Sequence, residues 1–265
     1  MQLLDGKALR DKIILSLKEE VSNLGKKPKL AIVLIGEDEP SLRYIKQKQK
    51  AAEEIGAEAE LLQFTESFAQ EEIIYQIKNL NRDNSITGII VQLPLPNKIS
   101  KQKVLASIDP KKDIDGLTPG SEFQPATPLG IMELLNEYKV EVKDKTAVVI
   151  GQSDLVGAPL SKNFEEKGAK VIRVDINTPK PIDPLVQQGD IVVSAVGQIG
   201  LVTAEMVKEG AVVIDVGTNV TPEGKLVGDV DFENVSKKAS FITPVPGGVG
   251  PMTVASLMKN LVKAS

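Results

Sequence analysis

Short apolar runs alternate with longer amphipathic segments along most of this chain, and that alternation restricts the possible folds more than any other feature. Five runs are apolar enough to be buried strands, at residues 30–35, 88–92, 146–150, 190–196 and 212–216. Between them, helical periodicity marks residues 7–24, 41–55, 70–80 and 159–167. Strands that alternate with helices are typical of parallel sheets covered by helices. The sequence therefore predicts an α/β protein.

The length of 265 residues allows two such units. We expect a first domain made of residues 1–119 plus 248–265, and a second domain of residues 120–247. A helix over residues 127–139 is expected to bridge them, and a last helix, with Pro251 in its first turn, is expected to return to the first domain. The N-terminus does not have the pattern of a signal peptide and no apolar run has membrane-spanning length, so we expect a cytoplasmic protein.

The composition excludes several kinds of chemistry. The chain contains neither cysteine nor histidine, which rules out disulfides, a thiolate nucleophile, a His-Ser-Asp triad and most zinc sites. Any proton transfer must use Lys, Asp, Glu, Tyr or bound water. The net charge of −4 argues against nucleic acid or an anionic membrane as the main partner.

One βαβ unit has the form of a nucleotide-binding site. The strand 146–150 ends at Gly151, and a tight loop leads through Ser153 to Gly157, where a helix begins. Exposed N–H groups and the helix dipole at such a point favour a phosphate. The loop departs from G-x-G-x-x-G, because Ser153 replaces the middle glycine and Gly157 falls one position late. An ordinary α/β crossover is the alternative.

A second strand, 170–174, leads to Asp175. An acidic residue at that place would accept hydrogen bonds from a ribose diol and would repel a 2′-phosphate. This favours NAD over NADP, although Arg173 and Lys180 are close enough in sequence to weaken the argument. A solvated carboxylate at the strand end is the other interpretation of Asp175.

The helix 41–55 carries a lysine where an apolar residue is expected. Its apolar stripe consists of Tyr44, Lys48, Ala51, Ala52 and Ile55. Lys48 is the only charge near the centre of that stripe, and Tyr44 lies one turn before it. Partial desolvation should lower the pKa of Lys48 and make the amine useful for proton transfer near neutral pH. The alternative is a snorkelling lysine whose ammonium reaches water.

Gln92 and two aspartate pairs could also contribute to a site. Gln92 ends the strand 88–92, where ligands of parallel sheets bind, so its amide could hold a ligand, hold the lysine or simply cap the strand. Asp113 and Asp115 could form a turn or a carboxylate site. Their Asp-x-Asp spacing recurs at Asp229 and Asp231 and would suit Mg²⁺, but turn and hydrogen-bonding roles explain it more simply, and we expect no metal.

Residues 243–255, rich in proline and glycine, suit a rigid loop that lets a ligand press against bare backbone. A plain turn before the last helix is the alternative interpretation.

Six motifs follow one another in an order that points to a known family. They are Ser41-Leu-Arg-Tyr-Ile-Lys-Gln-Lys48, Val91-Gln-Leu-Pro94, Lys112-Asp-Ile-Asp-Gly116, Pro125-Ala-Thr-Pro128, Gly151-Gln-Ser-Asp-Leu-Val-Gly157 and residues 243–255. With them the chain resembles the methylenetetrahydrofolate dehydrogenase/methenyltetrahydrofolate cyclohydrolase (FolD) family from Asp5 to its final helix. The resemblance implies a homodimer of α/β subunits. In each subunit the first domain is the folate-binding catalytic domain, the second is a Rossmann-like NAD(P)-binding domain with a parallel sheet, and a cleft lies between them.

It also implies two activities in one-carbon metabolism and purine biosynthesis. The first is oxidation of 5,10-methylenetetrahydrofolate with NAD(P)⁺, and the second is hydrolysis of the methenyl product to 10-formyltetrahydrofolate.

The same resemblance assigns roles to single residues. Lys48 is the expected catalytic lysine, Gln92 its hydrogen-bonding partner, Tyr44 the residue that stacks on the folate, and Asp115 the anchor of the pterin. The expected substrate-binding set is Tyr44, Lys48, Val91, Gln92, Leu93, Asp115, Pro246, Gly247 and Gly248, the last three lying between pterin and nicotinamide. The expected cofactor-binding set is Gly151, Gln152, Ser153, Val156, Gly157, Asp175 and Thr218.

The chain departs from the family pattern at three positions. Gln152 stands where most members have arginine, Asp175 stands where members commonly have a small hydroxyl or basic residue, and Ala126 replaces a cysteine. The first two changes favour NAD, with NADP as the other possibility. Alternatives for the function are a dehydrogenase without cyclohydrolase activity, a shikimate- or amino-acid-dehydrogenase-like oxidoreductase, and a nucleotide-sensing binding protein.

Overall fold

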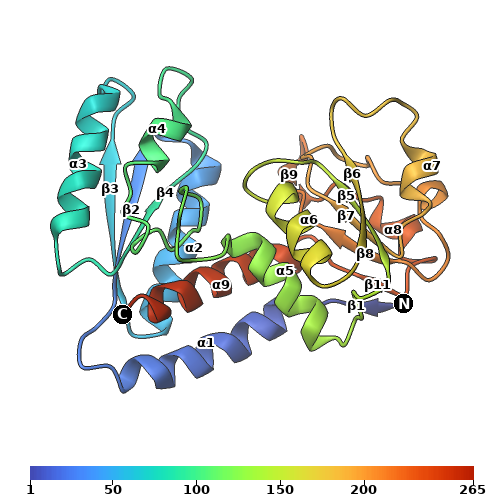
Figure 1. The fold of residues 1–265 in the computed structure, drawn as a ribbon, viewed down its shortest axis with the longest axis horizontal. Helices are drawn as coiled ribbons and strands as arrows, with labels where there is room; N and C mark the ends of the chain where they lie inside the picture. The colour runs from blue at the N-terminus through green and yellow to red at the C-terminus, as the bar shows by residue number, and fades with distance from the viewer. The chain divides into compact units, whose positions relative to one another are not determined.

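A computed structural model describes residues 1–265, which form two compact units (Figure 1). The large-sheet unit consists of residues 1–10 and 127–253, and the small-sheet unit consists of residues 11–126 and 254–265. The boundaries expected from the sequence, at 119 and 248, fall a few residues earlier. Residues 1–10 also differ from expectation, since β1 (Gln2–Leu3) pairs in parallel with β11 (Phe241–Ile242). That pairing joins the N-terminus to the large sheet.

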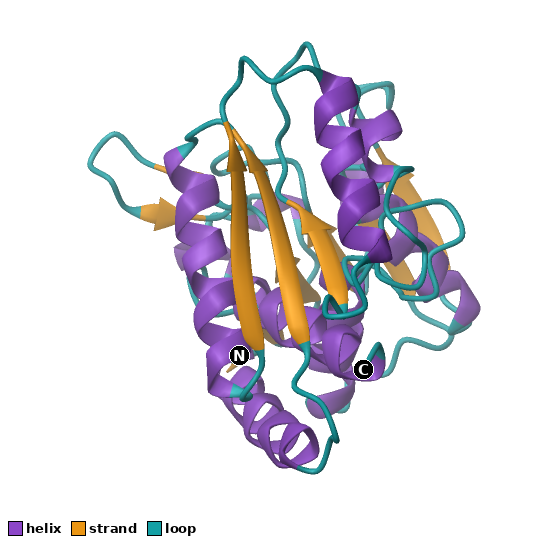
Figure 2. Cartoon of the chain, turned by 90° about the vertical axis from the view of Figure 1, so that its left-hand side faces the viewer, coloured by secondary structure: helices purple, strands orange, loops and turns teal.

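The small sheet has the strand order β3-β2-β4, and both pairings are parallel. Its strands are β2 (Lys29–Ile35), β3 (Glu58–Phe64) and β4 (Gly88–Val91). The helices that lie mostly in this unit are α1 (Gly6–Ser22), α2 (Glu39–Glu54), α3 (Gln70–Arg82), α4 (Lys101–Leu105) and α9 (Val249–Lys263). Figure 2 shows the three strands running together between helices.

The two faces of β2 explain this layering. Leu30, Ile32 and Leu34 belong to one buried cluster with residues of α1, α2 and α9. Ala31, Val33 and Ile35 belong to a second cluster with residues of α3 and α4. Because successive side chains of a strand point to opposite faces, a continuous apolar run must be covered on both sides. The same layering buries one face of α2.

The large sheet has the order β1-β11-β8-β7-β5-β6, and all its pairings are parallel. Its remaining strands are β5 (Thr146–Ile150), β6 (Lys170–Val174), β7 (Ile191–Ser194) and β8 (Val212–Asp215), and a short antiparallel pair joins β9 (Asn219–Val220) to β10 (Leu226–Val227). The helices are α5 (Ala126–Glu137), α6 (Gly157–Glu166), α7 (Asp183–Val186), α8 (Phe232–Val235) and the 3₁₀ helix η1 (Ala204–Met206).

The strand order places a topological switch point between β5 and β7. The chain passes from β5 to β6 on one side, then returns to β7 on the other side. Ligands of open parallel sheets bind beyond the carboxyl ends of the strands at such a point.

The strands expected at 146–150 and 170–174 are confirmed residue for residue, and the other expected strands and helices are confirmed with shifted ends. The sequence reading missed β3, because Glu58–Phe64 mixes charged and apolar residues and is only half-buried. No helix has the length and apolar character needed to span a membrane.

Candidate active site

The start of α2 sets the rotation that turns Lys48 inward. Asp38 caps the helix, and its carboxylate accepts a hydrogen bond from the Ser41 N–H at 2.9 Å. Pro40 in the first turn has a backbone suited to that place. In this register Ile45, Ala51 and Ala52 pack into the core together with Lys48.

The Lys48 side chain is buried, with 9% of its surface exposed. Its Nζ donates a hydrogen bond to Gln92 Oε1 at 3.0 Å. The interpretation of a snorkelling lysine is therefore wrong, because the ammonium ends on a protein acceptor instead of reaching water.

Gln92 is held in place by two hydrogen bonds of its own. It follows β4 directly, and its backbone N–H donates to the Val33 carbonyl at 2.8 Å. Its side-chain Nε2 donates to the Leu93 carbonyl at 2.8 Å. The second bond fixes the orientation of the amide, since an amide nitrogen can only donate. The amide oxygen is consequently left to accept from Lys48.

Burial and charge act in opposite directions on the lysine. Burial lowers the pKa of Lys48, and the negative charge of Asp115 opposes that shift. Burial also raises the pKa of Asp115, where Lys48 acts in the opposite direction and Asp113 adds to the rise. Desolvation disfavours the charged form of both groups. The small-sheet unit thus contains an amine with a weakened hold on its proton, beside a carboxyl group.

The remaining residues of the expected substrate set lie in two places. Tyr44 is half-buried one turn before Lys48 on α2, Val91 is buried and Leu93 is half-buried next to Gln92. Pro246, Gly247 and Gly248 belong to the large-sheet unit.

Backbone hydrogen bonds hold the loop that contains those three residues. The Gly248 N–H donates to the Pro244 carbonyl at 2.8 Å, and the Gly247 carbonyl accepts from the Lys7 N–H at 2.9 Å.

The expected nucleotide loop lies at the carboxyl end of β5. The Gly151 N–H donates to the Val174 carbonyl at 2.8 Å, and the Ser153 carbonyl accepts from Ala158 N–H at 3.1 Å. A Cβ at Gly157 would lie 1.7 Å from the Gly151 oxygen. Only glycine fits there, and this close packing brings the amino end of α6 against the end of the strand. Ser153 and Thr218 are exposed, and Val156 is half-buried.

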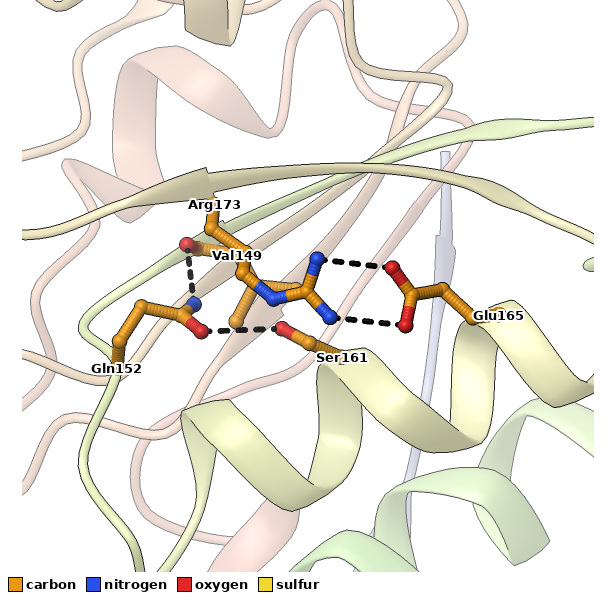
Figure 3. A network of polar contacts seen from close by, with 5 residues as sticks. All are labelled: Val149, Gln152, Ser161, Glu165 and Arg173. Carbon is orange, nitrogen blue, oxygen red and sulfur yellow. Dashed lines mark hydrogen bonds and ion pairs between the residues drawn. The ribbon is translucent and has the colours of Figure 1, made fainter.

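Polar contacts hold the neighbourhood of Gln152 (Figure 3). Its Nε2 donates to the Val149 carbonyl at 3.0 Å, and its Oε1 accepts from the Ser161 hydroxyl at 3.3 Å. Arg173 makes two hydrogen bonds of 2.8 Å to Glu165 on α6. Gln152, at the position where arginine is expected from the resemblance, is thus a neutral side chain, and the Arg173 guanidinium already has a carboxylate partner in Glu165.

Asp175 lies directly after β6 with its side chain exposed. Its Oδ1 accepts hydrogen bonds from the Asn177 N–H at 2.8 Å and from the Thr178 hydroxyl at 3.2 Å. These contacts hold an acidic group at the carboxyl end of the strand. The structure contains no cluster of three or more acidic side chains placed to hold a metal ion.

The sequence matches two family models that together cover nearly the whole chain. Residues 4–115 match the tetrahydrofolate dehydrogenase/cyclohydrolase catalytic domain, and residues 125–265 match the tetrahydrofolate dehydrogenase/cyclohydrolase NAD(P)-binding domain. The chain belongs to the tetrahydrofolate dehydrogenase/cyclohydrolase family.

Individual relatives agree with this assignment over nearly their full length. The bifunctional protein FolD of Nautilia profundicola is 45% identical, with 100% of this chain and 97% of the relative aligned. The crystal structure of the bifunctional FolD enzyme from Campylobacter jejuni matches with a TM-score of 0.97 at 45% identity, covering 100% of this chain and 98% of that one. The Trypanosoma brucei enzyme, solved with NADP and an inhibitor, matches at 0.93 and 38% identity, covering 98% and 95%.

Shikimate dehydrogenase shares only the fold. The structure from Aquifex aeolicus matches with a TM-score of 0.54 at 17% identity, covering 88% of this chain and 91% of that one. The alternative of a shikimate-dehydrogenase-like oxidoreductase therefore has no support beyond architecture.

Proposed function

We propose that this protein is bifunctional, oxidising 5,10-methylenetetrahydrofolate to 5,10-methenyltetrahydrofolate with NAD(P)⁺ and hydrolysing that product to 10-formyltetrahydrofolate. The observation that carries the proposal is the buried Lys48 ammonium on Gln92 Oε1 at 3.0 Å, with Asp115 acting on the same group. Family membership supports both activities. The buried amine of Lys48 could accept the proton that the hydrolysis releases, so this activity needs no histidine.

Lys48 is the proposed base of the hydrolysis. A neutral amine can donate one N–H to Gln92 and keep its lone pair for a proton of water. As the water oxygen bonds to the methenyl carbon, Lys48 takes one of its protons. The bond from that carbon to N5 then breaks while N5 gains a proton, so the formyl group stays on N10 and one proton is released overall. The positive charge of the substrate lowers the lysine pKa further.

The other substrate-binding roles follow the family pattern residue by residue. Tyr44 stacks on the folate, Asp115 holds the pterin, and Val91 and Leu93 flank Gln92 beside it. The loop of Pro246, Gly247 and Gly248 lets pterin and nicotinamide approach over bare backbone. We assign folate binding to the small-sheet unit and cofactor binding to the large-sheet unit.

The large-sheet unit has a place that fits a nicotinamide dinucleotide. The glycine packing at Gly157 leaves the amino end of α6 against the end of β5, where helix N–H groups and the dipole suit a pyrophosphate. When bound, the nicotinamide accepts the hydride from the methylene carbon. The protein has to align the two rings and keep them in place.

We propose that NAD is preferred over NADP. Three observations support this: Gln152 is neutral and tied to Val149 and Ser161, Arg173 is paired with Glu165, and the Asp175 carboxylate lies at the end of β6. A 2′-phosphate would meet a negative charge there without a free guanidinium to compensate. We also propose a cytoplasmic homodimer that serves one-carbon metabolism and purine biosynthesis, on the family pattern alone.

The test is an assay of the purified protein on methylenetetrahydrofolate with NAD⁺ or NADP⁺ in parallel. Reduction of the cofactor, followed by decay of the methenyl absorbance, is the expected result, with a higher kcat/KM for NAD⁺. Reduction without decay would instead favour a dehydrogenase that lacks cyclohydrolase activity. A protein that binds dinucleotide and turns over neither folate would be a nucleotide-sensing protein, contrary to the proposal.

A further inference from the structure

Two aspartates of the large-sheet unit are buried although neither belongs to the expected site. Asp229 is fully buried and Asp215 is 4% exposed. Asp215 ends β8, and Asp229 follows the β9–β10 pair. A buried carboxylate is costly unless hydrogen bonds compensate for its lost hydration, so the partners of these two groups show what they hold.

Asp229 accepts five hydrogen bonds. Its Oδ2 accepts from the hydroxyl of Ser194 at 2.9 Å and from the N–H groups of Val196 and Gly197 at 2.9 and 3.2 Å. Its Oδ1 accepts from the N–H of Gln198 at 2.9 Å and from Asn219 Nδ2 at 3.0 Å. Three successive backbone N–H groups therefore converge on one carboxylate, and this fixes the conformation of the loop 195–198 that follows β7.

Asp215 extends the same network to the neighbouring loops. Its Oδ1 accepts from the N–H groups of Gly217 and Asp229 at 3.0 and 2.9 Å, and its own N–H donates to the Thr243 hydroxyl at 2.7 Å. A Cβ at Gly217 would lie 2.1 Å from Asp229 Oδ1, so only glycine fits beside the carboxylate. The two aspartates thereby tie together the segments after β7, after β8 and at the start of residues 243–255.

These segments border the switch point of the large sheet. Across the sheet the order is β6, β5, β7, β8. With the adenine ribose at Asp175 after β6 and the pyrophosphate at the loop after β5, the nicotinamide half must extend across β7 and β8. The loop 195–198 turns its N–H groups toward Asp229, while Val196 is 46% exposed. It therefore offers apolar surface on the side away from the carboxylate.

We propose that Asp229 is a positioning residue for the nicotinamide half of the cofactor, acting through residues 196–198 and Asn219 without touching the dinucleotide. The inference rests on the proposed use of a nicotinamide cofactor. A carboxylate suits this role because both of its oxygens accept hydrogen bonds. Asparagine has only one accepting side-chain atom, so in either orientation its NH₂ would face donors that now bind Asp229. With the NH₂ in place of Oδ1 the loop would lose the bond from the Gln198 N–H, and with the NH₂ in place of Oδ2 it would lose those from the Val196 and Gly197 N–H groups.

The test compares Asp229→Asn with Asp231→Asn as the matched control. Asp231 lies two residues away and caps α8, where its Oδ1 accepts from the Asn234 N–H at 3.3 Å. Titration with NADH, followed by its fluorescence, gives the affinity for the whole cofactor, and competition by ADP gives the affinity for the adenine half. Hydrogen exchange of the amides at 196–198 reports the loop itself.

We expect Asp229→Asn to weaken NADH binding by about tenfold or more, as the loss of hydrogen bonds to a charged group implies, and to leave ADP binding within about twofold. Exchange at 196–198 should rise, and Asp231→Asn should change neither affinity. Unchanged NADH binding, or equal loss of NADH and ADP binding, would overturn the inference. Parent protein that binds no NADH would instead overturn the proposed function.

If Asp229→Asn does not fold, Asn219→Ala removes a single donor and should give the same split between NADH and ADP on a smaller scale. Equal affinities of Asn219→Ala and the parent for NADH would then count against the inference.

Discussion

The buried carboxyl group of Asp215 should make the stability of this protein depend on pH in an unusual direction. Burial raises the pKa of Asp215 from 3.8 to about 6. The hydrogen bonds that its carboxylate accepts from the backbone N–H groups of Asp229, Val230 and Gly217 act in the opposite direction. Because the folded state binds the proton more tightly, it is favoured at low pH. Stability is lost as the pH rises through the window between the two pKa values, and the loss is complete above the folded value.

The difference between the two pKa values corresponds to about 3 kcal/mol in the free energy of unfolding. About 1.4 kcal/mol of this falls between about pH 5 and about pH 8. Asparagine at position 215 does not titrate. The free energy of unfolding of the parent minus that of Asp215→Asn should therefore fall by about 1.4 kcal/mol over this range, whatever constant cost the amide adds.

Urea unfolding of both proteins at several pH values measures this difference directly, and taking the difference cancels the groups that titrate equally in both proteins. A difference that stays constant with pH, or one that rises, would refute the argument that desolvation dominates at Asp215.

Three further outcomes test the site. Lys48→Met should lower cyclohydrolase activity by about 100-fold or more, since the base is lost, while Lys46→Met on the exposed face of α2 serves as control and should hydrolyse methenyltetrahydrofolate at the parent rate; equal rates for both variants would remove Lys48 from the mechanism. Gln92→Glu places a negative charge next to the Lys48 ammonium and should raise the pKa of that lysine. The acid limb of the pH profile for hydrolysis should then move to higher pH, and a limb that stays in place or moves to lower pH would contradict the contact. Gln152→Arg combined with Asp175→Ser should raise the ratio of kcat/KM for NADP⁺ to that for NAD⁺ by about tenfold or more, and an unchanged ratio would reject these residues as determinants of cofactor choice.

Much of the fold could be read from the sequence because its strands are continuous apolar runs. The strand 146–150 and the strand 170–174 each lead to a residue with a local signal, Gly151 and Asp175. The strand β3 gave no such signal, because it lies at the edge of the small sheet and most of its residues are only half-buried. The N-terminal strand β1 has two residues, and its place depends on a partner more than 200 positions later in the chain. No local pattern could reveal that pairing.

The candidate site shows the same division between local and distant causes. Lys48 could be found because a charge in the centre of an apolar helix stripe is a local anomaly. Its bond to Gln92 joins residues 44 positions apart, and the sequence left open whether that amide would hold the lysine, a ligand or the strand end. Only its Asp-x-Asp spacing singles out Asp229 in the sequence, and that spacing favours a turn or hydrogen-bonding role over a metal site. Its five hydrogen-bond donors belong to β7, to the loop 195–198 and to β9. Its role in holding that loop therefore becomes visible only when the fold has brought these segments together.

The most direct measurement is the pKa of the Lys48 ammonium itself, followed by NMR of protein labelled in its lysine side chains. The resonance missing from Lys48→Met identifies the group. The burial of this amine predicts a titration well below the ordinary lysine value of 10.5, and addition of a cationic folate analogue should lower it further. A Lys48 that titrates at its ordinary value, with and without the analogue, would contradict its part as the base that makes this protein a cyclohydrolase.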